Sequence, residues 1–295
     1  FREGLALEVR SEQFDLADLG PYGKANLQGR GFVSGVIEGP YDGLRVRGST
    51  SMQRLQAQSF DLGTAAMRAE VDVEGEQLVV TEATVLKGAS ILRGRGATIE
   101  WRSEEPTIDA TIETRSARLP DLVGIARTRW PSLQDVVENL GGLADGDVVL
   151  SGAAAEPDAT ARFTLADVRT YGQDFTTGSL DLRVNRLTTY EVKKLLLRRG
   201  AGYFRFSGLT NVDDDTFEAT AKTRKLVVGD IDPLVQRIPS LKGGVTLDVG
   251  AKGTYAKPDV TGTLTLRDWR LAGPVRDDGV VMDQPLFTAR LSYSL

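Results

Sequence analysis

The 295-residue chain contains no cysteine and no histidine. Their absence excludes disulfides, iron–sulfur clusters, the usual zinc sites and acid–base catalysis by imidazole. No apolar run approaches the ~18 residues that a membrane-spanning helix requires, so the sequence predicts no such helix. Aromatic residues make up only 7% of the chain. Small and aliphatic side chains must therefore form most of its apolar surface.

Recognisable catalytic patterns are also missing. There is no Gly-x-Ser-x-Gly elbow, and Gly94-Arg95-Gly96 matches neither a dinucleotide-binding loop nor a Walker loop. No pair of carboxylates stands out from the other polar residues as an acid–base couple. We therefore expect a protein that is not an enzyme and that holds no cofactor and no metal.

The overall composition is that of a folded chain, with 41% hydrophobic and 26% charged residues. A net charge of −5 argues against nucleic acid as a partner. The absence of cysteine is compatible with several compartments, including the periplasm. The sequence starts at Phe1 without methionine and stops at Leu295 inside an alternating segment, so we expect an excised fragment of a longer protein.

Alternation of apolar and polar residues is the dominant pattern, as in 67–73, 108–112, 180–184, 260–266 and 287–293. A period of two places apolar side chains on one face of a β-strand and polar ones on the other. Turn residues separate these segments at intervals of about 8–12 residues. This spacing favours antiparallel strands that are joined by short loops.

The alternating segments belong to an internal repeat. One pattern of glycines followed by proline occurs three times, at Gly29, Gly35 and Pro40, at Gly146, Gly152 and Pro157, and at Gly244, Gly250, Gly253 and Pro258. A second pattern matches 108–115 with 217–224. Repeats of this length, roughly 100–115 residues, indicate one architecture that extends along an axis. We expect one elongated body over 1–295, with modules at 26–122, 123–234 and 235–295 and the end of a preceding module at 1–25.

Helical periodicity is confined to one position in each module. Leu133, Val136, Val137 and Leu140 have the spacing of one helix face, and they predict an amphipathic insert near 119–140. A second insert is expected near 229–239, and the equivalent position at 18–23 is reduced to a few residues.

An apolar face that continues through all modules must be covered, because leaving it in water forgoes about 25 cal/mol for each Å². Two-sheet sandwiches rarely repeat a unit of this length in tandem, and a parallel β-helix would show a shorter coil repeat of about 20–25 residues. We therefore expect an all-β fold, in which a long, mostly antiparallel sheet curls around its own apolar face. The groove would be nearly closed or filled by something apolar.

The residues expected to line this groove alternate along successive strands. They are Val71, Val73, Ile108, Ala110, Ile112, Val148, Leu150, Leu180, Leu182, Val184, Phe217, Ala219, Val245, Leu247, Leu264, Leu266, Phe287 and Leu291.

A family resemblance appears at this point. Residues 241–262 carry, with a small change of register, the pattern Leu-x-Gly-x-Val-x-x-x-Gly-x-x-x-x-Pro-x-x-x-Gly. The repeat continues with strand, glycine, strand and Ala-Thr-x-x-Thr-Arg before a short helix. In the order and repetition of these motifs, nearly the whole chain resembles the AsmA/TamB-like proteins.

The resemblance implies a fold, a place and a function. The fold is a long, mostly antiparallel sheet curled into a taco-like groove that aliphatic residues line, with short helical inserts. The place is the Gram-negative periplasm, in a protein with an inner-membrane anchor outside this segment. The function is bridge-like transport of phospholipids to the outer membrane. TamB-type members also bind an outer-membrane barrel protein, through a terminal region that this interior segment lacks.

Three local patterns allow two interpretations each. Asp213-Asp214-Asp215 could bind Ca²⁺, although a hydrated turn is favoured because no EF-hand spacing follows. Basic residues flank Leu195-Leu196-Leu197 and could hold a lipid phosphate or protect a strand edge from aggregation; they are Lys193, Lys194, Arg198 and Arg199. The segment with Arg127, Arg129 and Trp130 could lie on a membrane or cap the end of the sheet.

Other functions remain open. A structural or chaperone scaffold would receive outer-membrane strands at an exposed sheet edge by β-augmentation. A surface or adhesin-like β protein would have no groove. A carboxylate-based glycosidase is the least favoured of these. A long, unblocked edge strand would favour the scaffold, whereas a continuous dry groove would favour lipid transport.

Overall fold

The computed structural model describes residues 4–17, 27–40, 43–100, 105–227, 241–271 and 283–294. Strands account for 77% of the described structure, and the helices in this part of the chain are two short ones. The predicted all-β fold class is confirmed. The elements, in chain order, are β1 (Gly4–Asp15), β2 (Leu27–Pro40), β3 (Arg45–Ala57), β4 (Phe60–Asp72), β5 (Gln77–Lys87), β6 (Ser90–Glu100), β7 (Thr107–Arg118), α1 (Leu119–Ala126), α2 (Leu133–Glu138), β8 (Leu140–Ala153), β9 (Asp158–Thr170), β10 (Gln173–Asn185), β11 (Thr189–Arg199), β12 (Gly202–Asn211), β13 (Thr216–Arg224), β14 (Leu226–Val227), β15 (Leu241–Thr254), β16 (Pro258–Leu271) and β17 (Asp283–Ser294).

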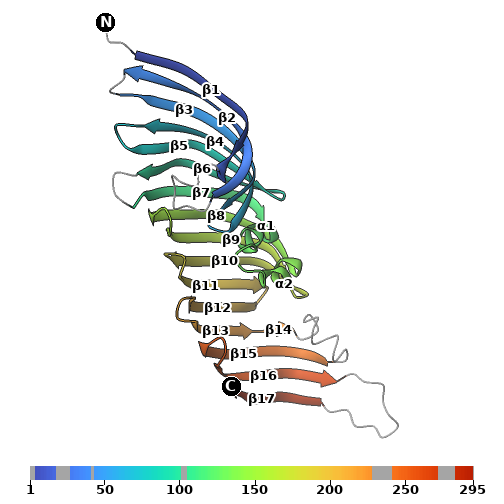
Figure 1. Cartoon of the computed structure of the whole chain (residues 1–295). Helices are drawn as coiled ribbons and strands as arrows, with labels where there is room; N and C mark the ends of the chain where they lie inside the picture. Colours follow the sequence, from blue (N-terminus) through green and yellow to red (C-terminus); the bar gives the residue numbers. More distant parts are fainter. Residues whose placement is uncertain are drawn as a thin grey trace. The chain divides into compact units, whose positions relative to one another are not determined.

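Internal packing divides the protein into two compact units. The first unit comprises Phe1–Glu138, Ala144–Ala161 and Asn185–Leu187, and the second comprises Asn139–Leu143, Arg162–Val184 and Thr188–Leu295. The strands β1 to β7 and both helices therefore belong to the first unit, whereas β11 to β17 belong to the second (Figure 1). The strands β8, β9 and β10 contribute residues to both.

Strands that follow one another in the sequence pair antiparallel, as in β1–β2, β5–β6, β11–β12 and β15–β16. Such pairs need only a short turn between them, which is what the closely spaced turn residues predict. At one of these turns the Asp72 Oδ1 accepts a hydrogen bond of 3.0 Å from the Gly75 N–H. The sheet that the described strands form is not closed into a barrel.

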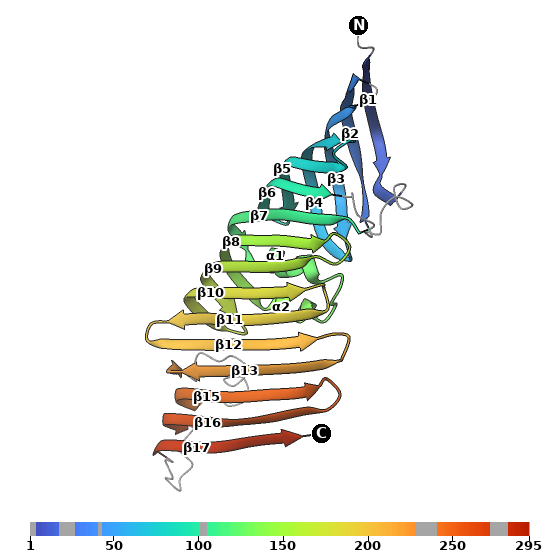
Figure 2. The same cartoon turned by 90° about the vertical axis from the view of Figure 1, so that its left-hand side faces the viewer.

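The first unit has an apolar core on one face of its strands. Met52, Leu55 and Ala65 are 1%, 7% and 0% exposed, and they come from β3 and β4. Phe14 of β1 and Val85 of β5 pack against them. Several strands of this unit are bent along their length (Figures 1 and 2), which brings side chains from five successive strands to a common interior.

Two backbone conformations recur at a constant spacing. Gly29, Gly142 and Gly243 have φ of +154°, +113° and +137°, and the residue ten positions later is in each case a glycine with positive φ. The residues 25 positions after the first glycine are Arg54, Asp167 and Asp268, which lie in the left-handed region. A Cβ on Gly142 would come within 2.8 Å of the Asp167 carbonyl oxygen. The close approach of β8 and β9 therefore requires glycine there.

This recurrence differs from the glycine repeat that the sequence suggests. Matching glycines by spacing alone pairs Gly29 with Gly146 and Gly244. The backbone conformation instead pairs Gly29 with Gly142 and Gly243, a shift of four residues in the second copy and one in the third. The reason is that strands here contain glycines of two kinds, and only those with positive φ mark equivalent positions.

The second repeated pattern has the same register in sequence and structure. Thr114 and Thr223 are 5% and 8% exposed, and both precede by two positions a residue of positive φ, Ser116 and Lys225. Both helices lie within the insert predicted near 119–140. Leu140 is an exception, because α2 ends at Glu138 and Leu140 begins β8. The inserts expected at 18–23 and 229–239 lie outside the described residues.

Candidate functional site

The second unit presents a continuous apolar surface, which the strand register defines. Directly opposed residues in antiparallel strands share a face, so the opposed pairs can be followed from β11 to β16. We call this surface the second apolar face. Its aliphatic and aromatic members are Val192, Leu195, Leu197, Phe204, Phe206, Phe217, Ala219, Ala221, Val245, Leu247, Val249, Ala251, Val260, Leu264 and Leu266.

The candidate residues of β13, β15 and β16 meet on this face. Leu247 stands opposite Leu264, and Val245 stands opposite Leu266. Ala219 stands opposite Ala251 of β15. Phe217 lies on the same face in β13, next to Tyr255, whose ring stacks on it with centroids 5.4 Å apart. Alternation alone was sufficient to predict these positions.

Most of the second apolar face is only half-buried. Val245 is 7% exposed and packs with Leu264 and Leu266, which remain partly accessible. Leu247 and Val249 are likewise of intermediate exposure. A row of aliphatic side chains that neighbouring strands do not fully cover is the property expected of a surface that contacts something apolar.

Phe287 and Leu291 belong to β17. They stand opposite Leu266 and Gly262 in the register of β16 and β17. Their side chains lie outside the part of the chain for which side chains are described.

The contacts around Gly178 show on which face the candidate residues of β10 lie. A Cβ on Gly178 would meet the Leu197 side chain at 2.7 Å and the Leu165 side chain at 3.3 Å, which places Gly178 on the second apolar face. Leu180, Leu182 and Val184 continue in steps of two along the same strand and so share that side. Val184 is 8% exposed, and the other two are half-buried.

The first unit places Val71, Ile108, Ala110 and Ile112 on its own apolar face. Val71 stands opposite Leu78, which is opposite Ile99, and Ile99 is opposite Ile108. Ile112 stands opposite Gly94, and Ala110, between the two isoleucines, is 6% exposed.

The three remaining candidates of this part of the chain are one residue in a turn and two residues in β8. Val73 lies in the turn after β4, which ends at Asp72, and is 50% exposed. The prediction extended the alternation one step past the end of the strand. Val148 and Leu150 lie on the less exposed side of β8, alternating with Val149, which is 38% exposed.

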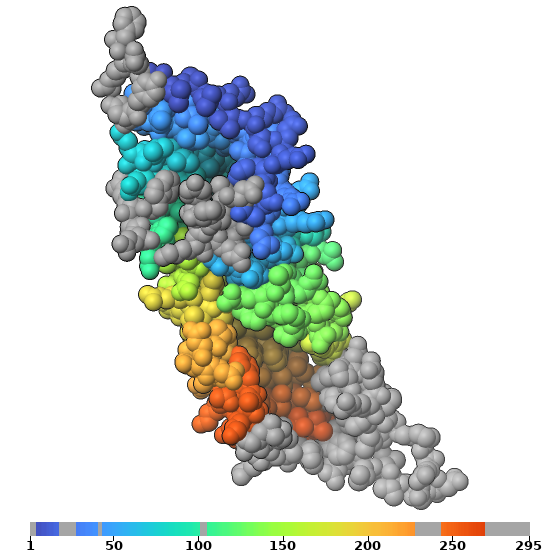
Figure 3. Space-filling view, in the orientation of Figure 1, coloured from blue at the N-terminus to red at the C-terminus, as the bar shows by residue number. Residues whose placement is uncertain are grey.

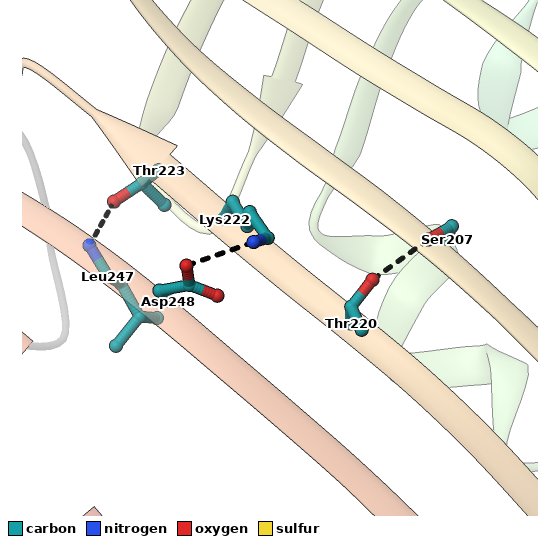
Figure 4. Close-up of polar contacts among 6 residues, drawn as sticks. All are labelled: Ser207, Thr220, Lys222, Thr223, Leu247 and Asp248. Carbon is teal, nitrogen blue, oxygen red and sulfur yellow. Dashed lines mark hydrogen bonds and ion pairs between the residues drawn. The ribbon is translucent and has the colours of Figure 1, made fainter. Parts of the chain in front are cut away.

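The opposite face of the second unit is polar (Figure 4). Lys222 of β13 forms an ion pair of 2.9 Å with Asp248 of β15, and Ser207 and Thr220 hydroxyls are 2.8 Å apart. These contacts link neighbouring strands in water. Thr223, on the apolar side, accepts a hydrogen bond of 2.9 Å from the Leu247 N–H. It satisfies a backbone donor where the direct β13–β15 pairing ends at Lys222 and Asp248.

The surface of each unit is hollowed (Figure 3). In the first unit a shaded recess lies between the dark-blue residues of β1 and β2 and the cyan residues of β4 and β5. In the second unit the orange residues of β13 to β16 border another recess.

Sequence reasoning missed part of both faces. Leu195 and Leu197 were left out because a β-bulge between Val192 and Leu195 interrupts the alternation. Lys193 and Lys194, both exposed, occupy that bulge. In the first unit the core residues Met52, Leu55 and Phe14 were also missed. Here the signal is weak, because a bulge lies between Met52 and Leu55 and another follows Ser11 in β1.

The insert packs against the end of the sheet. The Trp130 ring meets Phe60, at the start of β4, edge to face at 5.9 Å, and the Arg129 guanidinium lies 5.7 Å from the Phe60 ring centre. Arg129 also donates to the Leu187 carbonyl at 3.3 Å. Arg127 donates to Gln134 of α2. These contacts favour the capping interpretation over a membrane-surface one.

The acidic segment lies in the turn between β12 and β13. Asn211 donates to Asp214 and accepts from the Asp213 N–H at 3.0 Å, so the turn is held by its own residues. Within the described residues no cluster of three or more metal-ligating side chains is found. No helix among them has the length and apolarity to span a membrane.

Two surface carboxylates are perturbed by their partners. The Arg169 guanidinium donates to Asp174 at 2.8 Å and lowers the pKa of that carboxyl. The Ala17 N–H, and then Arg30, lower the pKa of Asp15 in the same way. Asp174 is exposed and Asp15 is half-buried, and each is an ion-pair partner outside the apolar faces.

The chain matches no known protein family, no curated protein and no solved structure. Its candidate site is therefore interpreted from its own geometry: half-buried apolar faces on strands whose reverse side is polar and hydrated.

Proposed function

We propose that this protein binds the acyl chains of phospholipids along its apolar faces and acts as a segment of a periplasmic bridge that carries lipids from the inner to the outer membrane. The observation that supports this most is the register from β11 to β16, in which apolar residues of neighbouring strands share one face. Their intermediate exposure leaves that face accessible to a ligand.

The physical basis is a balance between two apolar environments. Each buried CH₂ group contributes roughly 0.8 kcal/mol, whether an acyl chain is in a bilayer or against aliphatic side chains. Transfer between the two is then nearly neutral, and a lipid can move along the face without chemistry. The head group stays in water. The direction of flow and its energy must come from other components.

The resemblance to AsmA/TamB-like proteins supports the same proposal. It favours a periplasmic location, and we propose an inner-membrane anchor in a separate region of the parent protein. An outer-membrane barrel protein is the partner proposed for the terminal region of the parent, rather than for this segment.

The experiment is lipid analysis of the purified protein. We expect native mass spectrometry and solvent extraction to show co-purified phospholipid, and Leu247→Asp to lower the bound amount several-fold. An unpaired carboxylate on this face costs a few kcal/mol that acyl chains cannot offset. Thr261→Asp is the matched control, because Thr261 is exposed on the polar face opposite Gly250. Extraction that yields no lipid from the unmodified protein would exclude the proposal.

A scaffold for strand assembly is the second candidate. In the described structure β1 pairs with β2, and its Leu7 and Val9 are 49% and 41% exposed. In a scaffold of this kind, the other edge of β1 would accept a strand by β-augmentation. The variant Leu247→Asp distinguishes the two functions. A scaffold that binds strands at its edge should keep its function in this variant, whereas a lipid conduit should lose it.

A further inference from the structure

A pocket in the first unit is distinct from the apolar faces. It has a volume of about 720 Å³ and lies between α1 and the ends of β3, β4 and β5. This size is within the range of small-molecule sites, roughly 300–1,000 Å³. Its charged lining residues come from separate elements and are Arg54, Asp61, Lys87, Asp121 and Arg127.

The two carboxylates of the pocket already have fixed donors. Asp121 accepts from the Ser90 hydroxyl at 2.7 Å and from the Ala89 N–H at 3.0 Å. Asp61 accepts from the Gly63 N–H at 3.0 Å and lies 2.6 Å from the Lys87 ammonium. Neither carboxylate therefore needs a cation from solution.

The basic side chains of the pocket have fewer hydrogen-bond and ion-pair partners than its carboxylates. Within the described residues, Arg54 has no side-chain hydrogen bond or ion pair, and Arg127 has a single contact of 3.1 Å with Gln134. Lys87 is only 15% exposed, and its ion pair leaves two of its three donors for other acceptors. Three positive charges against two negative ones leave the pocket with an excess of donors. The ligand that fits such a lining is an anion with several acceptor oxygens.

We propose that this pocket binds a phosphate group through Arg54, Lys87 and Arg127. That the phosphate belongs to a phospholipid head group rests on the function proposed above, whereas the site itself does not. Leu86 and Val137 also line the pocket and offer apolar contact to the part of the ligand that follows the phosphate.

The test is isothermal titration calorimetry at low salt with three probes. They are inorganic phosphate, dihexanoylphosphatidylglycerol and dihexanoylglycerol, which lacks the phosphate. We expect the two phosphate-bearing probes to bind at one saturable site. The double variant Arg54→Asn and Arg127→Gln should weaken both at least about tenfold. Asparagine suits position 54 because it tolerates the left-handed backbone found there, φ +52°.

The control is the double variant Arg93→Gln and Arg95→Gln, which also removes two positive charges, from exposed positions of β6 that stand opposite Glu113 and Thr111 and do not line the pocket. It should leave binding of both probes unchanged. Circular dichroism of each variant checks that the sheet is intact.

The outcomes separate the site from the lipid function. Binding of inorganic phosphate without the phospholipid supports the site and overturns its assignment to a head group. Phospholipid binding that is equal in the double variant, with no phosphate bound, overturns the site and leaves acyl-chain binding standing. Absence of binding by both phosphate probes in the unmodified protein also overturns the site.

Discussion

At the scale of single residues, Thr223 shows how a side chain replaces a missing backbone contact. It is 8% exposed and accepts the Leu247 N–H at 2.9 Å. Thr223→Val keeps the shape of the side chain but leaves that donor without its acceptor. We expect the free energy of unfolding to fall by about 1–3 kcal/mol. Chemical unfolding followed by circular dichroism measures it.

Thr220→Val is the control at this scale. Thr220 lies on the exposed face and shares only a hydroxyl contact with Ser207. The same substitution should change stability by less than about 0.5 kcal/mol. Equal losses in the two variants would contradict the role assigned to Thr223.

The residues of the apolar faces were predictable where strands are regular. Leu247 and Leu264 alternate without interruption, and the structure opposes them. Prediction failed at Leu195 and Leu197, because a bulge changes which residues share a face. It also failed at Val73, because periodicity contains no signal for the residue at which a strand ends.

At the scale of elements, Gly142 controls the approach of β8 to β9. Its φ is +113°, and a Cβ there would lie 2.8 Å from the Asp167 carbonyl oxygen and the Val168 Cα. Gly142→Ala should therefore lower the free energy of unfolding by about 1–3 kcal/mol from backbone strain. Thermal unfolding monitored by circular dichroism measures the loss.

Gly250→Ala provides the comparison, since no atom lies within 4 Å of a Cβ at that position in β15. It should be close to neutral. A Gly142→Ala protein as stable as Gly250→Ala would show that β8 and β9 adjust at little cost.

Element types were easier to predict than their ends. The spacing of Leu133, Val136 and Val137 indicates a helix, and α2 contains all three. Leu140 fits the same spacing but starts β8, because apolar residues suit both elements at a junction. The equivalent glycines were also misassigned, since sequence spacing does not reveal which of them has positive φ.

At the scale of the whole molecule, the proposed transport can be tested with substitutions in different repeats. If lipids move along the apolar faces, a charge at any point should block the path. Leu182→Asp and Leu247→Asp fall in different repeats, and each should abolish transport through the parent protein. The measurement is outer-membrane integrity in cells that depend on this protein alone, with its abundance followed by immunoblot.

Arg183→Asp tests the opposite side of the same strand. Arg183 is exposed and alternates with Leu182, so its replacement should leave integrity nearly unchanged. Normal integrity in cells with stable Leu182→Asp protein would mean that the apolar faces are not the conduit.

The recurrent glycine conformations also bear on how such a protein changes in evolution. Gly29, Gly142 and Gly243 begin copies whose strands have the same backbone geometry at the same relative positions. Unequal crossing-over between two such copies in the gene would join strand ends that already match. The gene can therefore gain or lose a whole copy without a new core having to evolve, because each copy packs mainly on its neighbours. The span of the protein is thus a trait that selection can adjust in discrete steps.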